Sequence, residues 1–168
     1  SASSAFASKR SSSSNGPVST AIGESASIPA DYIPDPTLRL NLYARLEKAS
    51  SVGQIDELAE EFEDRFGELP PQIVTLLRLA KLKTVARKCG IERLEAGPTG
   101  LAVGFRTKPK PSLLKVLSRG RDAALHADRI VFATPTHSGN ERIGFFEDLF
   151  APLMMSPPFD KADSHRRR

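Results

Sequence analysis

The chain has 168 residues, 39% of them hydrophobic and 26% charged, which suits one ordinary domain with a modest core and is too short for two. No apolar run approaches the ~20 residues of a membrane-spanning helix, and the single Cys89 excludes an intrachain disulfide, so we expect a cytoplasmic protein without membrane contact. The formal charge is +4, but residues 28–152 hold 18 Lys and Arg against 17 Asp and Glu. The basic character therefore belongs largely to the two ends of the chain.

Eleven of the first 27 residues are serine, without apolar periodicity, and we predict residues 1–27 to be a disordered segment. Residues 28–152 are predicted to form the folded domain. Residues 153–168, with a Pro-Pro break and three final arginines, are predicted to be a disordered basic tail.

Three helices are predicted in the first part of the domain. Asp35 followed by Pro36 is typical of a helix start, and an apolar stripe follows at spacing four, formed by Leu38, Leu42 and Leu46. A second helix is predicted over residues 54–66, with Gly67 ending it in a left-handed conformation and with a buried face of Ile55, Leu58, Phe62 and Phe66. Pro71 then begins a leucine-rich third helix that ends at Gly90, and we expect it to be the central and most buried helix.

The period of the pattern changes after Gly90. Residues 91–96 and 101–105 flank the turn residues GPTG and predict a β-hairpin, and residues 129–134 predict a third strand. Residues 111–117 predict a short helix, and residues 140–153 an amphipathic one with Ile143, Phe146, Leu149 and Phe150 inside. The predicted fold class is α+β, with N-terminal helices packed on a small sheet that has flanking helices.

Residues typical of catalysis are not grouped in this sequence. His126, His137 and His165 have no Cys or carboxylate at ligand spacing, and His126 is expected in a loop or at the surface. Cys89 follows Val85 by four residues and is expected to be a small buried side chain. No phosphate-binding glycine loop is present, so we expect no enzymatic activity, no metal and no cofactor in this chain.

A basic segment over residues 106–121 allows a second hypothesis. It holds Arg106, Lys108, Lys110, Lys115, Arg119 and Arg121, which are able to contact phosphates, and only Phe105 beside it could stack on a base. The alternative function is therefore a small nucleic-acid-binding module that uses this segment and the arginine tail. A solvated junction between a strand and a helix is the simpler interpretation.

The sequence AEEFEDRFGELPP holds a dense run of carboxylates. At about 100° per residue, Glu57, Glu61, Asp64 and Arg65 lie along one side of the second helix, away from its buried face. Glu61 and Arg65 form an i,i+4 ion pair, whereas Glu60 and Asp64 repel each other at the same spacing. Outward carboxylates without a histidine do not indicate a metal site, so the face is either simply solvated or docks on a basic surface.

Several segments together resemble one protein family. IPADYIPDPTLRLNLYARL, ELAEEFEDRFGELPP, LLRLAKLKTVARKCGIERLE and GLAVGF, in this order, resemble the C-terminal domain of the bacterial transcription-repair coupling factor. The resemblance is strong from Ile28 to Phe105 and weaker through the last helix. The serine-rich start and the arginine end have no counterpart.

The resemblance implies a regulatory role. The full-length family member is an ATP-dependent DNA translocase that removes stalled RNA polymerase and recruits the repair protein UvrA. Its motor motifs, which bind ATP and Mg, are absent from this chain. The C-terminal domain is a non-catalytic module that packs on a UvrB-like N-terminal module of the same protein and covers the surface that UvrA would bind.

The resemblance also implies contact residues. The Glu, Asp and Arg with which the family domain contacts the UvrB-like module correspond to Glu61, Asp64 and Arg65 of this chain. We add Glu57 and Glu60 as further expected partner-binding residues. The expected partners are thus the UvrB-like module, in competition with UvrA, and indirectly RNA polymerase and DNA.

Overall fold

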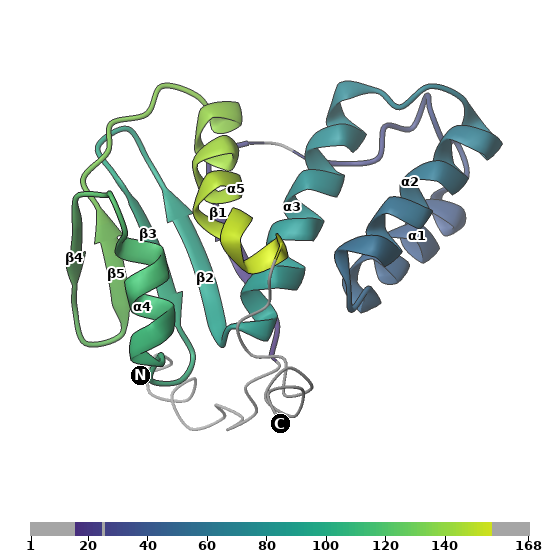
Figure 1. Cartoon of the computed structure of the whole chain (residues 1–168). Coiled ribbons are helices and arrows are strands. Elements are labelled where there is room, and N and C mark those ends of the chain that lie inside the picture. The colour runs from purple at the N-terminus through teal and green to yellow at the C-terminus, as the bar shows by residue number, and fades with distance from the viewer. Residues whose placement is uncertain (1–15, 25, 156–168) are drawn as a thin grey trace, which may run out of the picture.

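The computed structural model describes residues 16–24 and 26–155, which form two halves on either side of one long helix (Figure 1). The helical half (residues 28–77) and the sheet half (residues 16–24 and 79–155) each have a separate apolar core. Helix α3 (Pro71–Lys88) belongs to both, because Ile73 and Leu77 lie in the first core and Leu79, Leu82, Val85 and Ala86 in the second. The prediction that the third helix is the central one is confirmed.

The helical half begins as predicted. Helix α1 (Pro36–Lys48) starts at Asp35, whose carboxylate accepts a hydrogen bond from the backbone N–H of Thr37 at 2.9 Å. Helix α2 (Val52–Phe66) starts at Ser51, whose hydroxyl accepts from the N–H of Gln54. These side chains satisfy N–H groups that the first turn of a helix leaves without a partner.

The end of α2 differs in one respect from the prediction. Gly67 has a positive φ of 96°, but its ψ of −168° places it outside the left-handed helical region. Its N–H still donates to the carbonyl oxygen of Glu63. This backbone region is almost restricted to glycine. The prediction that a glycine ends the helix here is therefore confirmed, and the predicted left-handed helical conformation is wrong.

The sheet half contains a five-stranded mixed sheet in the order β1-β2-β3-β5-β4. Strands β2 (Ile91–Ala96) and β3 (Leu101–Phe105) form the predicted antiparallel hairpin, with Leu94 opposite Val103, and β5 (Arg129–Phe132) pairs with β3. Helices α4 (Pro111–Ser118) and α5 (Gly139–Met155) pack on the same core as α3. Ile143, Phe146, Leu149 and Phe150 of α5 are all fully buried, as predicted.

Two short edge strands were not predicted. Strand β1 (Ser19–Ala21) pairs in parallel with β2, and β4 (Ala123–Leu125) pairs with β5. Val18 and Ile22 on either side of β1 are buried. The predicted disordered segment over residues 1–27 is therefore wrong where β1 lies.

The C-terminal boundary of the folded domain also differs from the prediction. Helix α5 continues through Pro152, and Leu153 is buried in the core, so the predicted tail over residues 153–168 does not begin at 153. Residues 1–15 and 156–168, including the arginine end, lie outside the described residues. Five helices and a mixed sheet in the described residues confirm the α+β class. Of the first three helices, however, only α3 places buried residues in the core of the sheet half, and Val52 of α2 packs against that core.

Candidate docking surface

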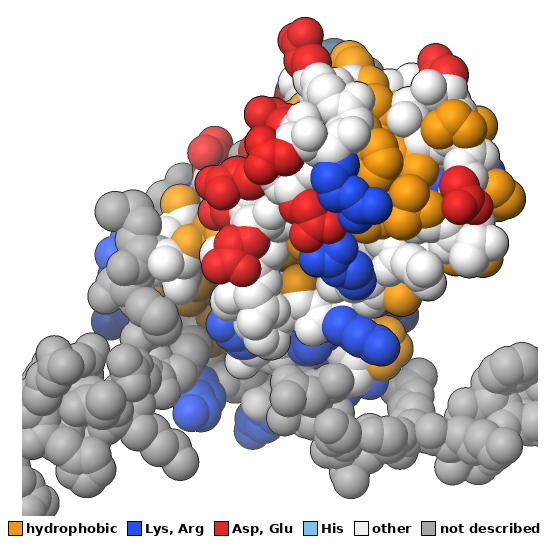
Figure 2. Space-filling model, turned by 90° about the vertical axis from the view of Figure 1, so that its right-hand side faces the viewer, with side chains coloured by type: hydrophobic (Ala, Val, Ile, Leu, Met, Phe, Trp, Pro, Cys, Tyr) orange, Lys and Arg blue, Asp and Glu red, His pale blue; other side chains and the backbone are white. Residues whose placement is uncertain are grey.

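Helix α2 presents its acidic residues on the outer surface of the helical half. Glu57, Glu60, Glu63 and Asp64 are exposed, whereas Ile55, Leu58 and Phe62 face the core. Figure 2 shows acidic side chains in a band over this half, next to a place where acidic and basic side chains alternate. The predicted orientation of the helix is confirmed.

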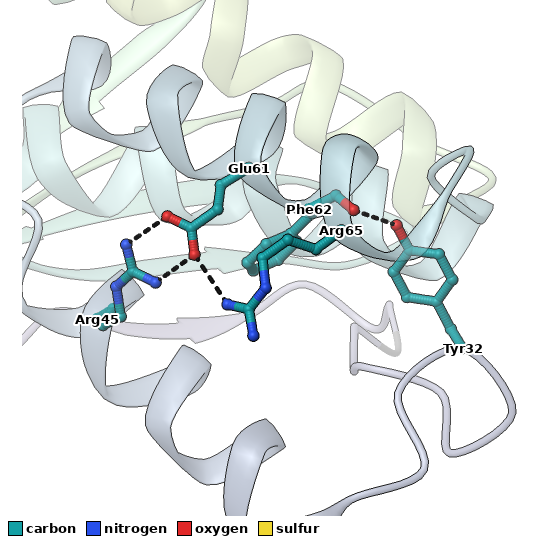
Figure 3. A network of polar contacts seen from close by, with 5 residues as sticks. All are labelled: Tyr32, Arg45, Glu61, Phe62 and Arg65. Carbon is teal, nitrogen blue, oxygen red and sulfur yellow. Dashed lines mark hydrogen bonds and ion pairs between the residues drawn. The ribbon is translucent and has the colours of Figure 1, made fainter.

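Glu61 lies at the centre of a three-residue ion-pair network (Figure 3). The Arg45 guanidinium of α1 donates to both of its oxygens, at 2.6 Å from Nη1 to Oε2 and 2.8 Å from Nη2 to Oε1. Arg65 Nη1 donates to the same Oε2 at 3.2 Å, which confirms the predicted i,i+4 pair. A two-pronged guanidinium–carboxylate pair fixes the orientation of both groups, so α1 and α2 are joined here by a defined polar contact.

The network changes the ionisation of Glu61. The hydrogen bonds from Arg45 first, and that from Arg65 second, together lower the pKa of this carboxyl to about 2, while partial burial opposes them. The side chain of Glu61 is 32% exposed and that of Arg45 47% exposed, so water and salt weaken the pair. Glu61 is charged throughout the physiological range and remains accessible from outside.

Aromatic side chains support the end of the same helix. The Arg65 guanidinium lies 5.0 Å from the centre of the Phe66 ring, which in turn meets the Tyr32 ring edge to face. The single hydrogen of the Tyr32 hydroxyl is shared between the carbonyl oxygens of Gly67, at 2.7 Å, and of Phe62, at 3.2 Å. Tyr32 thus supplies a donor to the end of the helix, and Arg65 is held over a packed surface.

The predicted contact residues divide into two groups. Glu61 and Arg65 are brought together, and Glu57 lines a shallow hollow with Glu61, Arg45 and Gln54. Glu60 and Asp64 are exposed and have no ion pair within the part of the chain that the structure describes. The prediction missed Arg45, because its contact with Glu61 spans 16 positions and depends on how α1 crosses α2.

The described residues show no grouping suited to catalysis. No three His, Cys, Asp or Glu residues among them lie close enough to hold a metal ion. His126 is exposed, as expected, and so is His137. Cys89 is half-buried against the sheet core, and its burial raises the pKa of the thiol. His165 lies outside the described residues, and no helix in residues 16–24 and 26–155 is long and apolar enough to cross a membrane.

The basic segment is less uniform than its sequence. Phe105, the residue proposed to stack on a base, is 5% exposed and belongs to the sheet core. Arg106 Nη2 donates to the carbonyl oxygen of Pro17 at 2.6 Å, and its Nη1 lies 3.7 Å from Glu92. Arg121 lies over the Phe145 ring. A base-stacking role for Phe105 is thus excluded by its burial.

These observations define an α+β domain with a charged, preorganised helix face and no evident catalytic site in its described part. The family model for the TRCF domain matches residues 22–116, more than half of the chain, and the chain belongs to this family. The name is that of the transcription-repair coupling factor, which the sequence motifs also indicated.

Known relatives agree. The chain is 40% identical over 81 residues to the transcription-repair-coupling factor of Escherichia coli (strain K12), which covers 48% of this chain and 7% of that protein. It is 33% identical over 100 residues to that of Rickettsia prowazekii, covering 58% of this chain and 9% of the relative. The chain therefore spans less than a tenth of the relatives that it matches.

The fold extends further than the sequence match. A crystal structure of the C-terminal domain of transcription-repair coupling factor superimposes with a TM-score of 0.69, over 88% of this chain and 99% of that one, at 22% identity. The architecture, including the sheet half, is thus that of the C-terminal domain.

Proposed function

We propose that this chain is the regulatory C-terminal module of a transcription-repair coupling factor. In this proposal the α2 face docks on a UvrB-like module of the same protein and masks the surface that binds UvrA. The parent protein would be an ATP-dependent DNA translocase that displaces stalled RNA polymerase and recruits nucleotide excision repair. ATP and Mg would bind to its motor domains outside this chain.

The observation that supports docking is the preorganised centre of the α2 face. Glu61 is held in one orientation by Arg45 and Arg65, and the exposed carboxylates of Glu57, Glu60 and Asp64 surround it. A charged face of this kind favours a basic partner and gives specificity more than affinity. Attachment to the same polypeptide supplies an effective concentration of about millimolar, so that a weak contact can stay closed and still open.

Arg45 has a specific role in this proposal. Because it occupies both oxygens of Glu61, a basic group of the partner must displace it or share the carboxylate with it. One ion pair is then exchanged for another, and the net gain in free energy is small. This keeps the docked state reversible.

The test is a double charge reversal, Glu61→Lys with Asp64→Lys, in binding to the UvrB-like module of a coupling factor. We expect binding to be lost, and wild-type binding to weaken as ionic strength rises. The control is Asp122→Lys with Asp148→Lys, which reverses two exposed carboxylates of the sheet half. Circular dichroism establishes that each variant folds, and Glu61→Gln with Asp64→Asn provides a milder pair.

Normal binding by the folded double reversal would refute the assignment of this face. The masking step has its own test, because UvrA and this chain should compete for the UvrB-like module. Simultaneous binding of both would contradict masking while leaving docking intact.

A further inference from the structure

A second charged surface lies in the sheet half, away from the α2 face. A hollow opens between the end of α3 and the loop that leads into α4, and its lining includes Lys88, Cys89, Thr107, Lys108 and Lys110. The three lysines are exposed and come from two separate segments. Their convergence could not be seen in the sequence, where Lys88 stands 20 positions before Lys108.

The lining of the hollow carries charge of one sign only. No Asp or Glu lines it, and residues 106–121 contain six Lys and Arg without a single carboxylate. Arg106 and Arg121 of that segment lie elsewhere, against Pro17 and Glu92 and over Phe145 respectively. The cationic lining of the hollow is therefore built by Lys88, Lys108 and Lys110.

The chemistry of this hollow fits phosphates better than a protein surface. Lysine is depleted from protein–protein interfaces, whereas its ammonium group binds phosphate as a compact point charge. Thr107 adds a hydroxyl, a common donor to phosphate oxygens, and the lining has no aromatic ring on which a base could stack. We propose that this hollow binds backbone phosphates of duplex nucleic acid without reading its sequence.

The first test measures affinity for a fluorescent 30-base-pair DNA duplex as a function of salt, using the full chain. We expect the triple variant Lys88→Gln, Lys108→Gln, Lys110→Gln to bind more weakly, and the slope of log K against log salt to fall by about 0.9 for each lost phosphate contact. The matched control replaces three lysines outside the hollow by Gln: Lys48 of α1 and Lys81 and Lys83 of α3. It loses the same charge and should keep the wild-type slope.

The second test uses Cys89, the single cysteine, as a reporter in the lining of the hollow. Duplex DNA should slow its modification by a maleimide at least several-fold in the wild type and in the control, but not in the triple lysine variant. Inorganic phosphate at the same concentration of charge should protect Cys89 from the maleimide less than DNA does, because its phosphates are not linked in a polymer.

Each result decides the proposal. Equal DNA affinity and equal salt slopes for the wild type and the lysine variant would overturn it. Any DNA binding would then be assigned to other basic residues. Protection of Cys89 by an acidic peptide but not by DNA would overturn the choice of nucleic acid. This inference is independent of the docking on α2, since Glu61→Lys with Asp64→Lys leaves the hollow unchanged.

Discussion

The two halves of the molecule use their charged side chains differently. In the helical half, the Arg45 guanidinium of α1 pairs with the Glu61 carboxylate of α2 at 2.6 Å, 16 positions away, and Arg39 donates to the carbonyl oxygen of Ile33, 6 positions away. In the sheet half, Arg93 and Arg106 also approach carboxylates, those of Asp128 and Glu92. In addition, Arg106 donates to the carbonyl oxygen of Pro17 at 2.6 Å and Arg142 to that of Ile22 at 2.9 Å, 89 and 120 positions away.

The difference follows from the kind of structure that each half contains. Helices satisfy most of their own backbone groups, so their surface side chains are free to pair with one another and to face a partner. A three-residue edge strand satisfies few of its own, and a buried carbonyl without a partner is costly. Arg106 and Arg142 supply such hydrogen bonds at Pro17 and Ile22, on either side of β1, and so hold a strand that lies far from them in the sequence. Arg39 does the same over a short sequence distance for the extended segment before α1, at Ile33 and Pro34.

The strongest test of the comparison asks whether the halves unfold separately. Phe62→Ala in the helical core and Phe146→Ala in the sheet core each remove a fully buried ring and should lower the free energy of unfolding by about 3–5 kcal/mol. Because α3 belongs to both cores, we expect each variant to destabilise the whole domain. Urea unfolding measures this.

The chain provides a convenient probe for that experiment. Both tyrosines, Tyr32 and Tyr43, lie in the helical half, and there is no tryptophan, so intrinsic fluorescence reports on that half alone. Phe146→Ala should shift the fluorescence transition as far as the circular dichroism transition. A fluorescence midpoint unchanged by Phe146→Ala would show that the halves are independent; Phe146→Leu serves if the alanine variant does not fold.

A medium-sized effect is expected at two glycines. Gly67 has a positive φ, and a Cβ added to it would meet no atom within 4 Å, so Gly67→Ala should cost about 1–3 kcal/mol through backbone strain alone. Gly144, inside α5, is equally open but has no positive φ. Gly144→Ala should stabilise the domain by about 0.4–1 kcal/mol. The midpoint temperature of unfolding should therefore fall for Gly67→Ala and rise for Gly144→Ala. Shifts in the same direction would contradict this account.

The smallest effect is expected at the ion-pair network. The pKa of Glu61 is lowered from 4.5 to about 2, so its contribution to stability is present above about pH 4.5 and is lost as the pH falls towards 2. For side chains this exposed we expect only about 0.2–1 kcal/mol. Arg45→Ala should raise the pKa of Glu61, as measured by carbon NMR titration of its carboxyl group, and an unshifted pKa would refute the network in solution.

Much of the fold could be predicted from local signals. Asp35-Pro36, Gly67, Pro71 and Gly90 mark helix ends, and the alternation of Leu101, Val103 and Phe105 marks a strand, because these depend on neighbouring residues only. Strands β1 and β4 could not be predicted. STA and AAL are too short to show a period, and each depends on pairing with a distant strand.

The candidate site was predictable to the same extent. The Glu61–Arg65 pair follows from helical spacing, but the stronger Arg45 contact depends on how two helices cross. Phe105 stands beside a basic segment in the sequence, yet strand alternation turns it into the core. In the candidate site, the contact within one helix could be predicted from the sequence, and the contact between two helices could not.

Helix α3 also has a mechanical consequence. Its 18 residues span about 27 Å. The first part of the helix packs against α1 and α2, and the rest packs against the sheet and α5. Arg78, near the middle of α3, donates through Nε and Nη2 to the two carboxylate oxygens of Glu147 in α5, which opposes rotation of α3 about its axis. A pull on α2 would therefore reach the sheet through α3, the helix that both cores share.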